Sequence, residues 1–286
     1  KDISAGKEFT YFQLNSKVNS AVRLLQKHNI KKGDIINLCL KNSTEFVILF
    51  FATIRVGAII SPLPSTMNEK ELRKSLKFAQ PKIVIIEKKF KNISEDYDTI
   101  EVDYINFTDE LEKFSNKPTN IKLEEDDLVC MYYSSGTTSD PKGILYSRKY
   151  HTTLIEGVVN HYKFTKDVTH LGFLPMAHTA IINYSLLPAA YVGGTLIFSE
   201  NFINIRTKFW DIVEKYNIGF VKTVPTVVFT ILNTKYPNYS KDKIKLAFVG
   251  CGSGPLPLST QNKFEEKYGI PVSNMYGTSE TGQINY

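Results

Sequence analysis

The chain has 286 residues, of which 42% are hydrophobic and 22% are charged, and its formal net charge is +6. A chain of this length can bury about three quarters of the surface that it exposes when unfolded, which suits one large domain or two closely associated subdomains. The longest apolar stretch, residues 46–54, is too short to cross a bilayer, and the amino end does not have the pattern of a signal peptide. We therefore expect a cytoplasmic protein without a transmembrane segment.

The cysteines and the charges narrow the possible functions. Cys39, Cys130 and Cys251 are widely separated, and each lies within or beside an apolar run, so they form neither a disulfide framework nor a metal-ligand pattern. The positive charge is spread over lysine-rich stretches with acidic neighbours, such as residues 87–91. This distribution predicts no nucleic-acid partner, whereas mild basicity suits small anionic ligands.

Strand-like and helix-like segments alternate along most of the sequence, which predicts an α/β fold with parallel sheets flanked by helices. The predicted strands cover residues 35–40, 58–60, 82–86, 128–133, 144–146, 171–174, 194–198, 220–222 and 246–249. The predicted helices cover residues 11–28, 43–56, 68–78, 150–162 and 206–216, with Ser43 and Asn68 as N-caps. Between these elements, residues 87–127 are polar and resemble an insertion that crosses the surface, with one short helical pattern at 109–114.

A loop between two of the predicted strands carries the clearest chemical signal. Residues 134–143 read Ser-Ser-Gly-Thr-Thr-Ser-Asp-Pro-Lys-Gly, which places five hydroxyls, two glycines and one lysine in a short segment. Small residues let backbone N–H groups approach phosphate oxygens, the hydroxyls add donors, and Lys142 brings a compact positive charge. We interpret this loop as a binding site for the polyphosphate of a nucleoside triphosphate.

The common Walker loop is excluded. Gly136 and Lys142 have its spacing, but Pro141 stands where the second glycine belongs and Gly143 where the serine or threonine belongs. For residues 134–138 alone, a solvated turn is an equally good interpretation. The Asp-Pro-Lys-Gly extension favours the phosphate loop.

Far downstream, residues 274–280 read Asn-Met-Tyr-Gly-Thr-Ser-Glu. Together, the two segments resemble those of the adenylate-forming enzymes, which include acyl-CoA synthetases, 4-coumarate–CoA ligases, luciferases and peptide-synthetase adenylation domains. The family's phosphate loop reads [ST]-S-G-[ST]-T-G-x-P-K-G, and this chain matches it except that Ser139 replaces the second glycine. If that position needs positive φ, serine costs about 1 kcal/mol there.

The family's downstream pattern is Y-G-x-T-E, whose hydroxyl contacts the α-phosphate and whose carboxylate holds magnesium. Ser279 takes the threonine position and keeps the hydroxyl, while Glu280 supplies the hard oxygen ligand that Mg²⁺ prefers. Taken alone, a Tyr-Gly turn that ends in glutamate is usually a strand end on the surface. The phosphate loop in the same chain favours the functional interpretation.

Two further stretches are similar to family motifs. Residues 251–256, Cys-Gly-Ser-Gly-Pro-Leu, resemble the S-G-A-A-P-L turn that passes against the adenine ring, and a plain strand-to-helix turn opened by Pro257 is the alternative. Residues 174–178, Leu-Pro-Met-Ala-His, resemble a P-[LM]-[FY]-H stretch whose histidine faces the acid and the adenylate. Here Ala177 replaces the aromatic residue, and a histidine beside apolar residues is more often structural, so His178 rests on the resemblance alone.

The resemblance implies a two-step reaction. A carboxylate attacks the α-phosphorus of ATP to give an acyl-adenylate and pyrophosphate, and CoA then takes the acyl group, so the implied ligands are ATP, Mg²⁺, CoA and a small carboxylic acid. The implied catalytic residues are Lys142, Ser279, Glu280 and His178, with Glu280 as the metal ligand. The implied nucleotide site comprises Ser134, Ser135, Gly136, Thr137, Thr138, Lys142, Gly252, Ser253, Gly254, Asn274, Met275, Tyr276, Gly277 and Ser279. Tyr184, Ile181 and residues 224–229 are candidates for an acyl pocket, with plain core positions as the alternative.

The resemblance covers nearly the whole chain and implies an acyl-CoA synthetase-like large domain with two α/β subdomains. One would span residues 34–151 and the other residues 1–33 together with 152–286, so that the first helix packs with the later half. Family members continue to a small carboxy-terminal domain with a catalytic lysine, which this sequence does not contain. We therefore expect residues 1–286 to be inactive alone in full turnover. An adenylation domain that loads a carrier protein and a nucleotide-binding module without catalysis remain open as alternatives.

Overall fold

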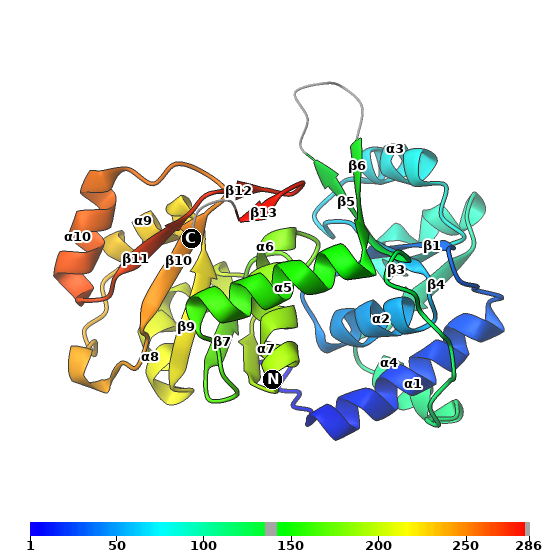
Figure 1. Ribbon diagram of the computed structural model, residues 1–286, viewed down its shortest axis with the longest axis horizontal. Helices are drawn as coiled ribbons and strands as arrows, with labels where there is room; N and C mark the ends of the chain where they lie inside the picture. Colours follow the sequence, from blue (N-terminus) through cyan, green and yellow to red (C-terminus); the bar gives the residue numbers. More distant parts are fainter. Residues whose placement is uncertain (135–141, 284–286) are drawn as a thin grey trace. The chain divides into compact units, whose positions relative to one another are not determined.

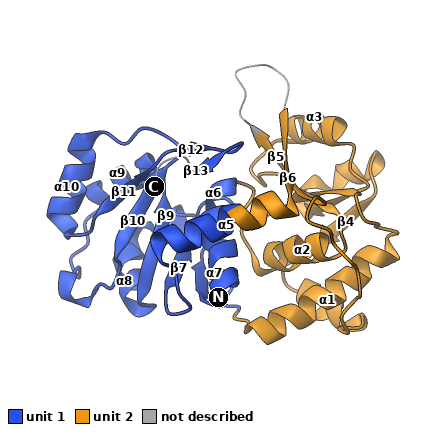
Figure 2. Cartoon of the chain, viewed as in Figure 1, with its two compact units in different colours: residues 1–7, 154–175, 179–286 blue, residues 8–153, 176–178 orange. Residues whose placement is uncertain are grey.

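The computed structural model describes residues 1–134 and 142–283 and divides the chain into two compact units (Figures 1 and 2). Unit 1 comprises residues 1–7, 154–175 and 179–286, and unit 2 comprises residues 8–153 and 176–178. Both units are α/β, with sheets flanked by helices, as the sequence predicts. Within the described ranges, the structure has no helix that is both long and apolar enough to span a membrane.

In the described part of unit 2, six strands form a sheet in the order β4-β3-β1-β2-β5-β6. The first five strands are parallel, and β6 runs antiparallel to β5. The strands are β1 (Ile35–Cys39), β2 (Ile59–Pro62), β3 (Ile83–Glu87), β4 (Thr99–Val102), β5 (Leu128–Ser134) and β6 (Lys142–Ser147). β1, β2 and β3 are almost entirely buried, because both faces of a parallel sheet are covered by other elements.

β4 corrects the expectation that residues 87–127 only cross the surface. Its four residues alternate between exposed and buried positions and extend the sheet beside β3. So short an edge strand, with Thr99 and Glu101 on its polar face, gives little hydrophobic signal in the sequence. The same stretch also contains η1 (Lys88–Glu95), α4 (Phe107–Glu110) and η2 (Leu111–Lys113).

The predicted N-caps of unit 2 are confirmed. The Ser43 side chain accepts a hydrogen bond from the Phe46 N–H at the start of α2 (Thr44–Arg55). At α3 (Glu69–Ala79), the Asn68 side chain accepts from the Glu71 N–H while the Glu71 carboxylate accepts from the Asn68 N–H. These hydrogen bonds satisfy backbone donors that a helix cannot pair internally.

α1 (Tyr11–Lys27) belongs to unit 2, which differs from the expected grouping of residues 1–33 with the later half. Its apolar face is buried, and Arg55 of α2 donates hydrogen bonds to Asn15 and Asn19 at 2.8 and 2.7 Å. Only the segment 1–7 joins unit 1, where the Ile3 N–H bonds to the Phe198 carbonyl. The physical reason is that the amphipathic helix packs on α2 of unit 2.

In the described part of unit 1, five parallel strands form a sheet in the order β11-β10-β9-β7-β8 (Figure 1). They are β7 (Thr169–Gly172), β8 (Thr195–Phe198), β9 (Ile218–Thr223), β10 (Phe248–Gly252) and β11 (Val272–Met275). β12 (Gly277–Thr278) and β13 (Gly282–Gln283) form a small antiparallel ribbon after β11.

The helical elements of unit 1 are α6 (Thr179–Ile181), the π-helical turn η3 (Ile182–Leu186), α7 (Leu187–Val192), η4 (Ile203–Lys208), α8 (Phe209–Lys215), α9 (Pro225–Asn233), η5 (Lys241–Lys243) and α10 (Leu258–Tyr268). α5 (Arg148–Tyr162) contributes residues to both units. The core of unit 1 is rich in aromatic rings. Trp210 is 2% exposed and packs against Tyr268 at 4.7 Å between ring centroids, so its fluorescence reports on the folding of this unit.

Candidate functional site

Two of the predicted motifs meet at the carboxyl edge of the unit 1 sheet. β10 and β11 are parallel neighbours, with Cys251 paired to Asn274 and Gly252 to Met275. The chain therefore leaves both strands at the same edge, the place where open α/β sheets bind ligands. This register brings the turn at 252–254 beside the beginning of the segment 276–280, although more than twenty residues separate them in the sequence.

Glycine is required at position 252. A Cβ atom there would lie 2.5 Å from the Met275 carbonyl oxygen and 2.6 Å from Nζ of Lys222. The next residue, Ser253, has a φ of 65° and is exposed, as is Gly254. A residue other than glycine in the left-handed region is uncommon and is often found at functional sites. The turn also leads into α10, which begins at Leu258, so the two interpretations of this motif are compatible.

The second motif begins in β11, continues through β12 and ends in the turn between β12 and β13. Gly277 pairs with Gln283, and a Cβ atom on Gly277 would overlap the carbonyl oxygen of Gly282. The Thr281 N–H donates to the Thr278 hydroxyl at 3.2 Å, which closes the turn around Ser279 and Glu280. Glu280 and Tyr276 are exposed, and Ser279 is half-buried. Glu280 therefore lies at the surface of unit 1.

Unit 2 carries the other predicted residues. Ser134 ends β5 and pairs in register with Lys142, which begins β6 and is exposed. The antiparallel pairing holds the two ends of the predicted phosphate loop next to each other, and the strands predicted on either side of that loop are confirmed. Ser135, Gly136, Thr137, Thr138 and Ser139 lie outside the described residues.

His178 also belongs to unit 2, in the short segment 176–178. The Met176 N–H donates to the Asn42 side chain at 2.6 Å, and Met176 itself is 1% exposed. Asn42 directly precedes Ser43, the N-cap of α2, so the same helix start anchors this segment. His178 is exposed. No sequence pattern predicted Asn42 as an anchor.

The carboxylate of Glu280 fits a metal ion that arrives with a nucleotide. Within the described residues, no cluster of three or more His, Cys, Asp or Glu side chains could hold a metal by itself. Mg²⁺ in nucleotide sites is commonly bound by one or two carboxylates together with substrate phosphates. An exposed Glu280 has the chemistry for that role.

Sequence reasoning missed Lys222, the fifth residue of β9. This lysine is 3% exposed and extends toward Gly252, in the same part of unit 1 as the two motifs. Burial lowers its pKa to about 8. The available signal was a lysine in the middle of an apolar strand, where charged residues are rare unless they are paired.

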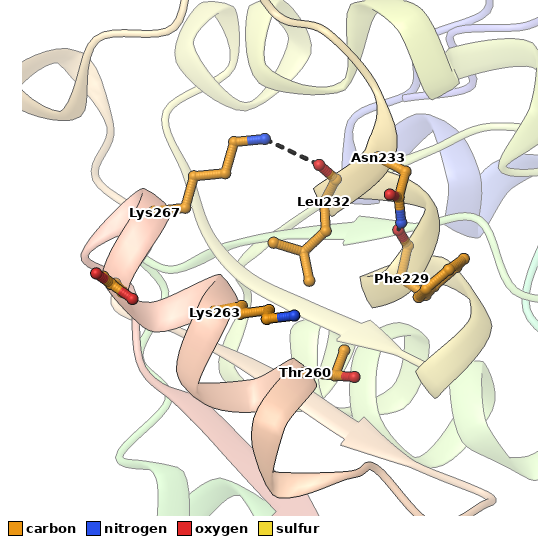
Figure 3. A pocket seen from close by; sticks show the side chains of 7 residues that line it. Phe229, Leu232, Asn233, Thr260, Lys263 and Lys267 are labelled. Carbon is orange, nitrogen blue, oxygen red and sulfur yellow. Dashed lines mark hydrogen bonds between the residues drawn. The ribbon is translucent and has the colours of Figure 1, made fainter.

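A groove of about 590 Å³ lies elsewhere on unit 1, between α9 and α10 (Figure 3). Its lining residues are Phe229, Leu232, Asn233, Thr260, Lys263, Glu266 and Lys267. The Lys267 ammonium donates to the Leu232 carbonyl at 2.9 Å, which places its charge at the carboxyl end of α9. Phe229 is the last residue of the 224–229 segment that the sequence suggested for an acyl pocket, whereas the other lining residues belong to no predicted motif. We therefore separate the groove from the candidate site at the carboxyl edge of the sheet.

A parallel α/β sheet with a glycine turn and a carboxylate turn at its carboxyl edge is typical of a nucleotide-binding protein. Residues 2–285 match the family of AMP-binding enzymes, and the chain belongs to this family. It is 27% identical to 4-coumarate–CoA ligase 1 from Petroselinum crispum, over 98% of this chain and 54% of that protein. It is 25% identical to the oxalate–CoA ligase of Arabidopsis thaliana, over 99% of this chain and 58% of that protein. The chain thus spans a little more than half the length of these curated relatives.

Solved structures give the same fold. The ATP-bound MatB from Rhodopseudomonas palustris matches with a TM-score of 0.90 at 24% identity, over 99% of this chain and 57% of that one. The inhibitor-bound N-terminal domain of FACL13 from Mycobacterium tuberculosis matches with a TM-score of 0.89 at 23% identity, over 98% of this chain and 71% of that one. The predicted α/β fold of the acyl-CoA synthetase type is therefore confirmed.

Proposed function

We propose that the protein is an AMP-forming acid–thiol ligase, which activates a carboxylic acid with ATP and transfers the acyl group to CoA. The observation that carries the proposal is the register of β10 and β11, which brings the turn at Gly252 and the turn at Glu280 to one edge of the unit 1 sheet. Membership of the AMP-binding family supports the same activity. The similarity to CoA ligases favours CoA over a carrier protein as the acceptor.

The residue types suit this reaction because its nucleophile arrives already ionised. The protein must align two anions and neutralise charge on the phosphorus oxygens, and it needs no covalent intermediate. In this proposal Lys142 and the hydroxyls of Thr137 and Thr138 bind the outer phosphates, while the Ser279 hydroxyl donates to an α-phosphate oxygen. Glu280 would hold Mg²⁺, which supplies positive charge beside the phosphates when it is bound.

The remaining proposed residues position the substrates. Ser253 and Gly254 are exposed and carry little or no side chain, so their backbone is open to the flat face of a nucleobase, and Gly252 precedes them at the end of β10. His178 is the residue that would face the acid and the adenylate. Asn42 holds the segment before it, so replacing Asn42 would disturb His178 without touching a substrate.

The test is acid-dependent exchange of pyrophosphate into ATP by the full-length protein, across a panel of aliphatic and aromatic acids. Glu280→Gln should lower the exchange rate about 100- to 1,000-fold, the usual effect of losing one preorganised electrostatic partner. Glu266→Gln is the matched control, because Glu266 is also an exposed glutamate of unit 1 but lies on α10 outside the motifs. Consumption of CoA, compared with loading of a pantetheine-bearing carrier protein, then identifies the acceptor.

Two results would contradict the proposal. One is the absence of exchange with every acid in the panel, which would favour a nucleotide-binding module without catalysis. The other is equal activity of Glu280→Gln and the parent protein. We further expect residues 1–286 alone to form no thioester, which a CoA-consumption assay of the isolated chain measures.

A further inference from the structure

Lys222 is a buried cation of unit 1. It lies on β9, an interior strand of the unit 1 sheet, and it is 3% exposed. Within the residues that the structure describes, no carboxylate lies at ion-pair distance from its ammonium and no acceptor hydrogen-bonds to it. The ammonium lies over the face of the Tyr184 ring, with Nζ 5.2 Å from the ring centroid. A lysine ammonium has three donors, so this arrangement leaves its hydrogen-bonding capacity unused.

Glycines make room for this side chain on the sheet. Lys222 pairs in register with Gly250 of β10, and Gly252 lies two residues further along the same face. The side chain of Met275 covers Gly250, since a Cβ atom there would lie 2.5 Å from its terminal methyl group. Nζ of Lys222 extends instead to Gly252, where a Cβ atom would lie 2.6 Å away. The ammonium therefore sits at the carboxyl edge of the sheet, next to the turn that the proposed function assigns to the nucleotide.

The π-helical turn η3 packs against this side chain through Tyr184, whose ring lies beneath the Lys222 ammonium. All five of its residues are buried, including Tyr184, and α6 before it places Ile181 over Gly172 at the carboxyl end of β7. Single π-helical turns are rare and are often found at functional sites. Tyr184 and Ile181 are also the residues that the sequence suggested for an acyl pocket. The ammonium of Lys222 thus lies near both Tyr184, one of the predicted acyl-pocket residues, and Gly252 at the start of the nucleotide turn.

The electrostatics indicate an anionic ligand. Burial lowers the pKa of Lys222 to about 8, and the neighbouring Cys251 thiol opposes this only in part. At pH 7 the side chain is therefore mainly protonated, and the Tyr184 ring face is a weak partner for a buried charge. A purely hydrocarbon acyl chain would leave the ammonium unpaired, whereas a carboxylate would pair with it.

We propose that Lys222 is a specificity-determining residue whose ammonium binds a second carboxylate on the acid substrate, so that the protein selects dicarboxylic over monocarboxylic acids. This inference rests on the proposed function, because it assumes that the acid is activated at the carboxyl edge of this sheet. The reacting carboxylate faces the nucleotide, and the second carboxylate pairs with Lys222. The second carboxylate and the Lys222 ammonium keep their covalent bonds in this interaction.

The experiment compares acids that differ only at the far end, such as adipate with hexanoate and terephthalate with 4-methylbenzoate. Pyrophosphate exchange is measured with the full-length parent protein, with Lys222→Met and with Lys263→Met. Methionine keeps the length of the stem and removes the charge, and Lys263 is an exposed lysine of the same unit. Lys222→Met should lower kcat/KM for the dicarboxylic acid about 30- to 4,000-fold, the range for breaking a buried charge pair. Activity with the monocarboxylic acid should stay level or rise, and Lys263→Met should match the parent.

The other possible results of this experiment separate a failure of the inference from a failure of the proposed function. If the parent protein does not prefer the dicarboxylic acid, or if Lys222→Met keeps the preference, the inference is wrong while the proposed function stands. If Lys222→Met lowers kcat/KM equally for both acids, the ammonium acts on the reacting carboxylate that the two acids share. In that case too, the specificity role is wrong. If no acid supports exchange, the proposed function fails. In that case, carboxylate binding at Lys222 is tested by the unfolding midpoint with and without 10 mM dicarboxylic acid. Binding at Lys222 requires that the acid raise the midpoint of the parent protein and leave that of Lys222→Met unchanged.

Discussion

His170 should make the stability of unit 1 depend on pH in the mildly acidic range. This residue of β7 is fully buried and packs edge-on against Phe164 and Phe220, at 4.6 and 5.4 Å between ring centroids. Neither ring nitrogen makes a hydrogen bond of normal geometry within the described residues. Burial lowers the pKa of His170 from 6.5 to about 4, and the backbone of Tyr184 offsets this only in part.

The sign and the size of the effect follow from the two pKa values. Between pH 6.5 and pH 4 the unfolded chain binds a proton at His170 that the folded chain does not, so the free energy of unfolding falls as the pH falls. The loss is absent above pH 6.5 and complete below pH 4. A difference of about 2.5 pH units corresponds to about 3 kcal/mol, a substantial part of the stability of an ordinary domain.

The perturbation is His170→Leu, and the assay is urea unfolding of the 286-residue chain followed by Trp210 fluorescence from pH 7.5 to pH 4.5. At pH 7.5 the free energy of unfolding of the variant should be within about 1.5 kcal/mol of that of the parent, because leucine is similar in volume to histidine and suits the surrounding apolar core. As the pH falls, the parent should lose about 2–3 kcal/mol more than the variant. His161→Gln, which removes an exposed histidine of the same unit, is the control. Parallel pH profiles for the parent and His170→Leu would refute the reasoning.

Three further predictions test the candidate site. Lys142→Ala in the full-length protein should lower pyrophosphate exchange about 100- to 1,000-fold. The unfolding midpoint should stay unchanged, because this side chain is exposed, and an unaltered exchange rate would show that Lys142 is not part of the site. Gly252→Ala should lower the free energy of unfolding by about 1–3 kcal/mol, because the added Cβ atom would lie 2.5 Å from the Met275 carbonyl oxygen. Trp210 fluorescence in urea measures this change, and an unchanged free energy of unfolding would show that position 252 has room for a side chain. Lys222→Met should raise the free energy of unfolding of the unliganded chain at pH 7 by up to about 3 kcal/mol, because burial disfavours the charged ammonium. A variant less stable than the parent would contradict the interpretation that this buried charge destabilises the unliganded chain.

Local sequence patterns were sufficient for much of the fold. Long apolar runs predicted the buried parallel strands β1 and β3, and Ser43 and Asn68 predicted the helix starts, because each of these signals acts within a few residues. β4 was missed because an edge strand of four residues needs its neighbour β3 to be stable. The grouping of α1 was also wrong, since an amphipathic helix specifies a buried face but not the partner that covers it.

The candidate site was predictable in its motifs but not in its assembly. The glycines at 252 and 277 were visible in the sequence, yet their need for space comes from Met275 and Gly282, which approach only in the folded sheet. Lys222 was overlooked for the same reason. A lysine within an apolar strand is a signal by itself, but its meaning depends on the glycines of β10 that leave room for the stem.

His170 and Lys222 show why burial has different consequences along one face of the unit 1 sheet. His170 pairs in register with Phe220, and Lys222 follows Phe220 by two residues on the same strand face. Burial lowers the pKa of both side chains, to about 4 for His170 and to about 8 for Lys222. At pH 7 the imidazole therefore stays neutral among aromatic rings, whereas the ammonium keeps its charge at the carboxyl edge. A neutral ring is compatible with a closed core, but a buried charge is retained at a cost in stability that a ligand can offset, which is the trade-off expected of a substrate-binding residue.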